Sequence, residues 1–70
     1  MNRSDVTELQ RRLTAAGYPC VADGLEGPET RRQADAWQAA RGGVPLGHGG
    51  CAVVLAALRA LDVPTTRTFV

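Results

Sequence analysis

Residues 17–30, with the sequence GYPCVADGLEGPET, are the densest run of turn-forming residues in the chain and constrain its fold most strongly. We expect Gly17 to end a helix in the left-handed conformation and Pro19 to prevent that helix from resuming. The Asp-Gly pair at 23–24 is typical of a tight turn. The Gly-Pro pair at 27–28 favours a helix start, because the N–H that proline lacks would have no partner there. The segment therefore predicts a helix, a loop and a second helix.

Hydrophobic spacing predicts the first helix over about residues 5–16. Four apolar residues recur at helical spacing and would share one face: Val6, Leu9, Leu13 and Ala16. Asp5 and Glu8 are three residues apart, a pattern typical of a capping box at a helix start. Gln10 lies beside the apolar face, and we expect its amide to bond loop backbone that the helices leave unpaired.

Two further helices are expected, over about residues 28–40 and 51–61. Trp37 is the only tryptophan, and we interpret it as a central core residue rather than a sugar-stacking platform. The third helix is apolar on almost all sides, with Arg59 as its one charged residue. We interpret it as a core helix; the alternative is that one face is exposed and docks a partner.

An ordered set of residues carries a family resemblance: Leu9, Gln10, Leu13, Gly17, Tyr18, Asp23, Gly24, Gly27, Thr30, Trp37 and Gln38. Over about residues 6–61 the chain resembles the small helical peptidoglycan-binding domain found beside many cell-wall hydrolases. The resemblance implies an all-α fold, a compact three-helix domain with two pseudo-symmetric loops. Residues 43–53 resemble residues 17–30 in a form that is three residues shorter and has lost the Asp and the Thr.

Chain length and charge limit the domain count and the partners. The 70 residues are expected to form one three-helix domain over residues 1–63, with a flexible tail or the start of a linker over 64–70. The net charge is only +1, and nucleic-acid-binding modules usually show a concentrated basic excess, so we expect no nucleic-acid partner. No stretch approaches the roughly 18 apolar residues of a membrane span, so we expect no membrane partner either.

The resemblance implies a place in the cell envelope or outside the cell, in a bacterial or phage setting. The N-terminal sequence MNRSDVTEL has no apolar segment after a basic one and does not have the pattern of a signal peptide. Three explanations stay open. The chain is a piece of a larger secreted protein, it belongs to a phage lysin that reaches the wall without a signal, or it works in the cytoplasm.

The sequence contains no catalytic constellation, so we expect no enzyme and no cofactor. One Ser, one His and no nucleophile elbow do not build a triad. Asp23 and Glu26 are two carboxylates three residues apart, but both fall in a turn where solvent surrounds them. The resemblance implies instead a non-catalytic module that targets a linked or partner hydrolase to peptidoglycan. The alternative is an intracellular protein-interaction domain that docks a partner on its third helix.

The candidate ligand-binding residues lie in or beside the first loop: Tyr18, Asp23, Leu25, Glu26 and Arg31. Acidic and arginine side chains there would pair with the amines and carboxylates of the wall's stem peptides. The residues expected to shape the loop are Gly17, Gly24, Gly27, Pro28 and Thr30.

The two cysteines, Cys20 and Cys51, both flank turn-rich segments. In an oxidising compartment they would form a disulfide that closes about 30 residues and contributes roughly 3–4 kcal/mol. Free buried thiols are the second interpretation. The third is a mixed zinc site with His48 and an Asp, but the chain has no Cys-x-x-Cys pair and we expect no metal.

Overall fold

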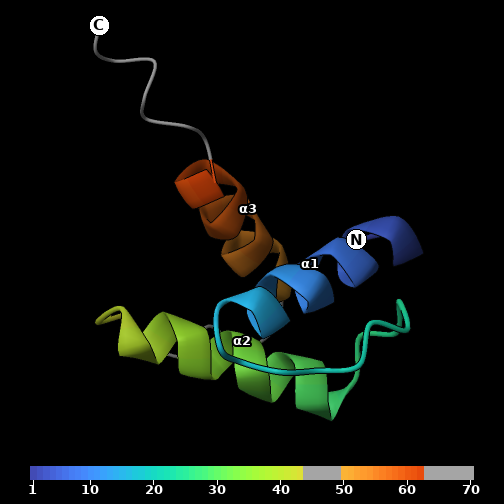
Figure 1. The fold of residues 1–70 in the computed structure, drawn as a ribbon, viewed down its shortest axis with the longest axis horizontal. Coiled ribbons are helices and arrows are strands. Elements are labelled where there is room, and N and C mark those ends of the chain that lie inside the picture. Colours follow the sequence, from blue (N-terminus) through green and yellow to red (C-terminus); the bar gives the residue numbers. More distant parts are fainter. Residues whose placement is uncertain (44–49, 63–70) are drawn as a thin grey trace, which may run out of the picture.

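The structure, a computed structural model, describes residues 1–43 and 50–62, and these residues form three α-helices and no strand. Helix α1 spans Arg3–Ala15, α2 spans Pro28–Ala40 and α3 spans Gly50–Asp62 (Figure 1). The predicted all-α, three-helix class is confirmed. Most of the predicted second loop, including His48, and the predicted tail over 64–70 lie outside the described residues. Within them, no helix has the length and apolar character needed to cross a membrane.

Helix α1 begins two residues earlier than predicted, because its cap is Asn2. Asn2 Oδ1 accepts a hydrogen bond from the Asp5 N–H at 2.8 Å, which places Asp5 inside the first helical turn. The predicted capping box of Asp5 and Glu8 is therefore wrong. Ala16, which was expected on the buried face, is the exposed C-cap.

Helices α1 and α2 end in the same kind of glycine-centred cap. After α1, Gly17 has φ +97° and its N–H donates to the Thr14 carbonyl at 3.1 Å. The Tyr18 N–H donates to the Leu13 carbonyl at 2.8 Å. This pair of bonds is a Schellman motif, and Gly42, with φ +84°, occupies the corresponding place after α2. Both helix ends are therefore set by short-range bonds around a glycine.

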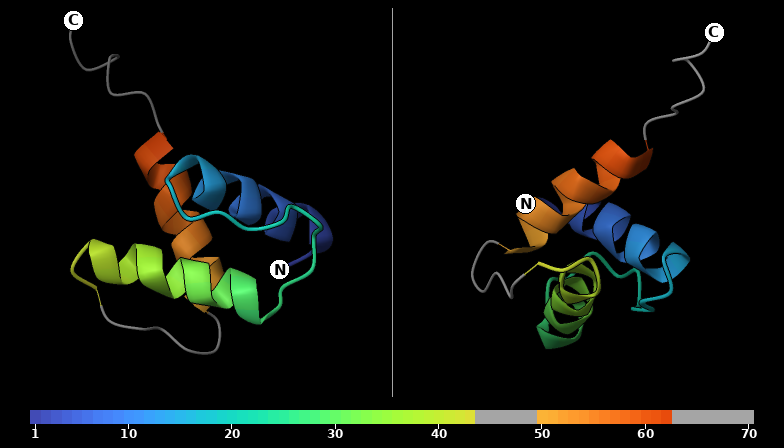
Figure 2. Two further views of the ribbon diagram at one scale, coloured as in Figure 1. Left: turned by 60° about the horizontal axis from the view of Figure 1, so that its bottom comes forward. Right: turned by 90° about the vertical axis from the view of Figure 1, so that its left-hand side faces the viewer.

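The three helices pack around one core. Helices α1 and α2 run in roughly the same direction, the loop between them returns along their length, and α3 crosses them (Figure 2). The core comprises Leu9, Leu13, Ala34, Trp37, Cys51, Val54, Leu55 and Leu58. Trp37 is only 5% exposed, which confirms that it is a core residue.

Helix α3 divides its apolar residues between the core and the surface. Its buried residues are Cys51, Val54, Leu55 and Leu58, and its exposed residues include Ala52, Val53, Ala56, Ala60 and Leu61. The core interpretation is confirmed for one face. The other face is exposed among the described residues and is apolar apart from Arg59.

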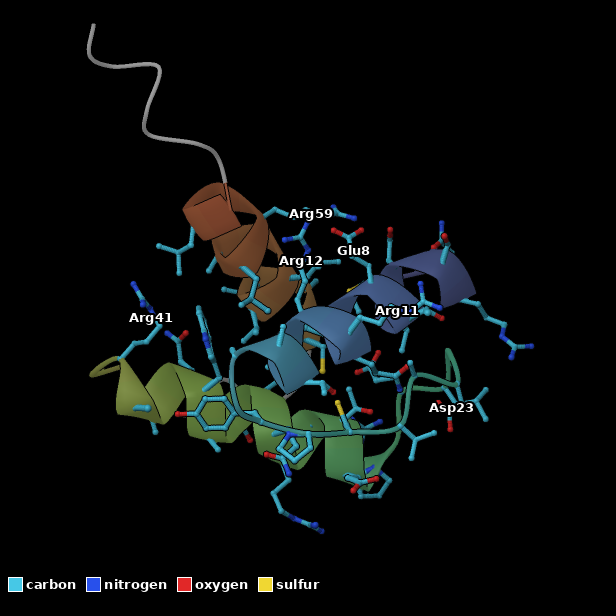
Figure 3. The ribbon with its side chains drawn as sticks, in the orientation of Figure 1. Glu8, Arg11, Arg12, Asp23, Arg41 and Arg59 are labelled. Carbon is cyan, nitrogen blue, oxygen red and sulfur yellow. The ribbon has the colours of Figure 1, made fainter. Side chains whose placement is uncertain are left out.

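A cluster of charged side chains joins α1 to α3. Arg59 Nη2 lies 2.6 Å from Glu8 Oε1 and 3.1 Å from Asp5 Oδ1. Glu8 Oε2 also accepts from Arg12 Nε at 2.8 Å (Figure 3). The hydrogen bonds from Arg59 first and Arg12 second lower the pKa of Glu8 to about 2. Glu8 thus orients α3 on α1 instead of capping a helix.

Candidate functional site

The side-chain amide of Gln10 holds the loop between α1 and α2. Gln10 is 1% exposed, and its Oε1 accepts the Gly24 N–H at 2.9 Å. Its Nε2 lies 3.0 Å from each of three oxygens, which are Asp23 Oδ1, the Leu25 carbonyl oxygen and Thr30 Oγ1. The expectation that Gln10 bonds loop backbone is confirmed. One buried side chain therefore joins α1, the loop and the first turn of α2.

Asp23 closes a turn on its own backbone. Its Oδ1 accepts the Leu25 N–H at 2.9 Å in addition to the contact with Gln10. These bonds, the one from Leu25 first, hold the pKa of Asp23 below its usual value. Its carboxylate is therefore ionised at neutral pH and lies at the outer bend of the loop, on the opposite side of the molecule from Arg41 (Figure 3).

Gly24 is the point at which the loop presses against the first turns of α1. It has φ +76°, and a Cβ there would lie 3.0 Å from Thr7 Oγ1 and 3.3 Å from the Arg3 carbonyl oxygen. Arg3 Nη2 reinforces this contact by donating to the Asp23 carbonyl at 3.0 Å. Conformation and space both require glycine at this position.

The first half of the loop is tied to the other end of α1. Thr14 Oγ1 accepts the Cys20 N–H at 3.2 Å, and Cys20 Sγ lies 3.6 Å from the Gln10 carbonyl oxygen. Together with the Gln10 amide, these contacts keep the loop against α1 from Cys20 to Leu25.

A hollow of about 270 Å³ opens between this loop and the first turn of α2, and we call it the loop hollow. It is lined by Gln10, Val21, Asp23, Leu25, Gly27, Pro28, Glu29 and Thr30. Val21 and Leu25 are both largely exposed, so they present apolar surface to a ligand. A concave apolar surface with a few convergent polar groups is the usual form of a binding site.

The structure separates the predicted ligand-binding residues. Asp23 and Leu25 line the loop hollow. Glu26 and Arg31 do not line it and pair with each other, with Arg31 Nε 3.6 Å from Glu26 Oε2. Tyr18 is half-buried against the core, also outside the hollow. Ligand binding by these five residues stays a prediction.

Two further residues of the loop hollow, Val21 and Glu29, are absent from the predicted set. The sequence feature that points to Val21 is an apolar side chain within a turn-rich segment, where the turns themselves do not need an apolar residue. The signal for Glu29 was its place directly after the Gly-Pro helix start, since the first turn of a helix faces the loop that leads into it.

The residues expected to shape the loop differ in what their positions demand. Gly17 and Gly24 have positive φ, and Pro28 is the first residue of α2. Thr30 is buried and bonds the Gln10 amide. Gly27 is the N-cap of α2 with extended backbone, φ −117°, and a Cβ there would meet no atom within 4 Å. Its backbone therefore does not require glycine.

Cys20 and Cys51 are free thiols in the structure, and both contact the hydrophobic core. Burial is the main cause that raises the pKa of each thiol, and for Cys51 the Glu26 carboxylate adds to it and the pKa reaches about 11. Their disulfide stays a prediction for oxidising conditions. No group of three metal-ligating side chains occurs among the described residues.

The fold and the loop hollow define a small helical domain that holds a binding surface beside its first interhelical loop. Residues 2–45 match the family model of the peptidoglycan binding domain, which covers more than half of the 70 residues. The chain belongs to this family of peptidoglycan-binding domains. No curated protein and no solved structure matches the chain.

Proposed function

We propose that this chain is a non-catalytic module that binds peptidoglycan in the loop hollow and targets a linked or partner hydrolase to the cell wall. The observation that carries the proposal is that every residue lining the hollow lies within the matched segment 2–45. The family supplies the class of ligand and the hollow supplies a place for it. Binding to the wall would keep an attached hydrolase at a high local concentration on its substrate.

The lining of the hollow suits a polymer of sugars and short peptides. Val21, Leu25 and Pro28 offer apolar surface for methyl groups and for the apolar faces of sugar rings. Asp23 and Glu29 offer acceptors for the N–H and O–H groups of such a ligand. Because the loop is anchored by the buried Gln10 amide, little ordering of the chain would accompany binding.

We infer binding rather than cleavage from the character of Asp23 in the hollow. A general acid at neutral pH needs a raised pKa, usually from burial, whereas the pKa of Asp23 is lowered and its side chain is exposed.

A module that binds peptidoglycan would work at the cell envelope of a bacterium, whether a protein of the bacterium itself or a phage protein carries it.

Co-sedimentation with insoluble peptidoglycan sacculi over a salt series tests the proposal. We expect the domain in the pellet and its release by soluble wall fragments. Leu25→Ser should weaken pelleting, while Val53→Ser is the matched control, because Leu25 is 59% and Val53 53% exposed and only Leu25 lines the hollow. Folded protein that stays wholly in the supernatant would refute wall binding by this chain.

A second candidate function, an intracellular protein-interaction domain, is favoured by one observation. An apolar groove of about 310 Å³ is lined by Arg12, Ala15, Ala16, Trp37, Leu58 and Leu61, and Leu61 on α3 is largely exposed. This groove shares no residue with the loop hollow. Capture of a specific partner that Leu61→Ser abolishes and Leu25→Ser leaves intact would support this candidate over wall binding.

A further inference from the structure

The apolar groove between the three helices has a lining that is partly buried and partly exposed. Trp37 and Leu58 line it and are only 5% and 8% exposed, whereas Leu61, which also lines it, is 55% exposed. Ala15 and Ala16, at the end of α1, complete the lining with side chains too short to fill the space beside α3. The described residues therefore leave apolar surface uncovered next to the core.

The charge and the size of the groove limit what can occupy it. Among the residues that the structure describes, Arg12 is the one charged residue of the lining, and its Nε donates to Glu8 Oε2 at 2.8 Å. This charge is already matched, so it does not select an acidic occupant. The volume of about 310 Å³ is at the small end of the range for ligand pockets. Such a groove suits one or two large side chains better than the whole face of a partner helix.

The sequence directly after α3 has a composition that suits this groove. Residues 63–70 read VPTTRTFV and contain no acid, and they include the only phenylalanine of the chain, Phe69. Helix α3 ends at Asp62, the residue after Leu61 of the groove. Pro64 disfavours a helical conformation of the residue before it, which favours a change of direction just after α3.

The length of this segment allows Phe69 to reach the groove. Seven residues in extended form span at most about 25 Å, whereas Leu58 and Asp62 are only about 6 Å apart along the helix axis. Because the segment is attached beside the groove, its side chains have a high effective concentration there, and a weak contact is enough to populate a docked form.

We infer that residues 63–70 turn back after α3 and place the side chain of Phe69 in the apolar groove, against Leu58, Leu61 and Trp37. Burial of a phenyl ring against these apolar side chains is the driving force. The inference does not depend on peptidoglycan binding, because the groove and the loop hollow share no lining residue. It replaces the flexible tail that the sequence predicts with a segment that extends the core. A partner that used the groove would first have to displace this segment.

A double-mutant cycle on the full chain tests the contact. Phe69→Ser and Leu61→Ser should each lower the melting temperature by about 4–8 °C. The double variant should lower it by clearly less than the sum, because either change alone breaks the same contact. Val53→Ser is the matched control, since Val53 is 53% exposed on α3 and lies outside the groove, so its effect should add to that of Phe69→Ser. Additive effects of Leu61→Ser and Phe69→Ser, or no effect of Phe69→Ser, would overturn the inference.

Nuclear Overhauser effects give a second and direct readout of the same contact. The ring protons of Phe69 should show them to the methyl groups of Leu58 and Leu61 and to the indole of Trp37. A mixture of isotope-labelled and unlabelled chains should show that these contacts arise within one chain. Their absence, as expected of a groove left open for a separate partner, would overturn the inference. Contacts found only between labelled and unlabelled chains would overturn it as well, because a second copy would then fill the groove.

Discussion

The side-chain oxygen of Gln10 accepts a hydrogen bond from the backbone N–H of Gly24 at 2.9 Å, across 14 residues of sequence. The bond is buried, and the nitrogen of the same amide lies against the Leu25 carbonyl oxygen and the Thr30 hydroxyl. A loop without regular structure thereby acquires a fixed position on α1. The shape of the loop hollow depends on this one amide.

Replacement of Gln10 by Leu should destabilise the domain by about 2–4 kcal/mol, because it leaves the buried Gly24 N–H and Leu25 carbonyl without partners. Urea unfolding followed by circular dichroism measures the change, and amide exchange at Gly24 should accelerate. Gln33→Leu, at a half-buried position of α2 outside this network, is the control. Equal stabilities for the two variants would contradict the role of Gln10.

Alanine at three glycines should give a graded series of stabilities. Gly27→Ala should leave the free energy of unfolding nearly unchanged, because the φ of Gly27 is negative and no atom would crowd the added Cβ. Gly17→Ala should lower the free energy of unfolding by about 1 kcal/mol for its positive φ alone. Gly24→Ala should lower it by about 2 kcal/mol or more, since crowding by Thr7 and Arg3 adds to the positive φ. Any other order of the three melting temperatures would refute this account.

Stability should fall in acid partly through Glu8. Its pKa is about 2 in the folded state against an ordinary value of 4.5, so its stabilising contribution is complete above about pH 4.5 and is lost as the pH falls towards 2. Glu8→Gln should therefore show a shallower decline of the melting temperature between pH 4.5 and 2. Glu29→Gln, which removes an acid outside this ion cluster, is the matched control. Parallel slopes for Glu8→Gln and the unaltered chain would contradict the prediction.

Substitution of Trp37 should lower the stability of the domain more than substitution of any other core residue. Trp37→Ala removes a large buried side chain, which typically costs about 3–5 kcal/mol of stability. In a domain this small, that loss would leave most of the molecules unfolded. Trp37→Phe should fold with a loss of about 1–2 kcal/mol. Arg41→Ala, which removes only the cation stacked 5.0 Å from the ring centroid, should cost less than about 1 kcal/mol. Denaturant titration of the three variants checks the order.

Cys51 should resist alkylation in the folded, reduced protein. It is buried and its pKa is raised to about 11, so very little thiolate forms at pH 8. Iodoacetamide labelling followed by mass spectrometry should modify Cys51 only after urea is added. After oxidation, protection of both cysteines in urea and a mass lower by the two thiol hydrogens would establish the predicted disulfide. Labelling of both in urea after oxidation would refute it.

Short-range chemistry made much of the fold predictable. The Gly-Pro start of α2 at Pro28 and the glycine-centred end of α1 at Gly17 depend on residues within one helical turn, and both were expected from the sequence. The start of α1 was misplaced for the same kind of reason. Asn2 and Asp5 are both good capping residues, and the sequence does not say which one the helix uses.

The candidate site was only partly predictable. The loop and its turn at Asp23 follow from sequence, and so did the expectation that Gln10 bonds loop backbone. The lining of the hollow did not, because Val21 and Glu29 reach it through the path of the whole loop. Glu26 and Arg31 were expected to face a ligand, whereas the structure pairs them with each other.

By itself, the sequence determined the three helices, the main loop between the first two and the family to which the chain belongs, because these depend on periodicity, turn residues and motif order. Only the tertiary structure decided which polar groups meet. Glu8 meets Arg59 across 51 residues, and Gln10 meets Thr30 across 20. Such contacts depend on how the helices pack around Trp37 and Leu9, and a pattern of neighbours along the chain does not contain that information.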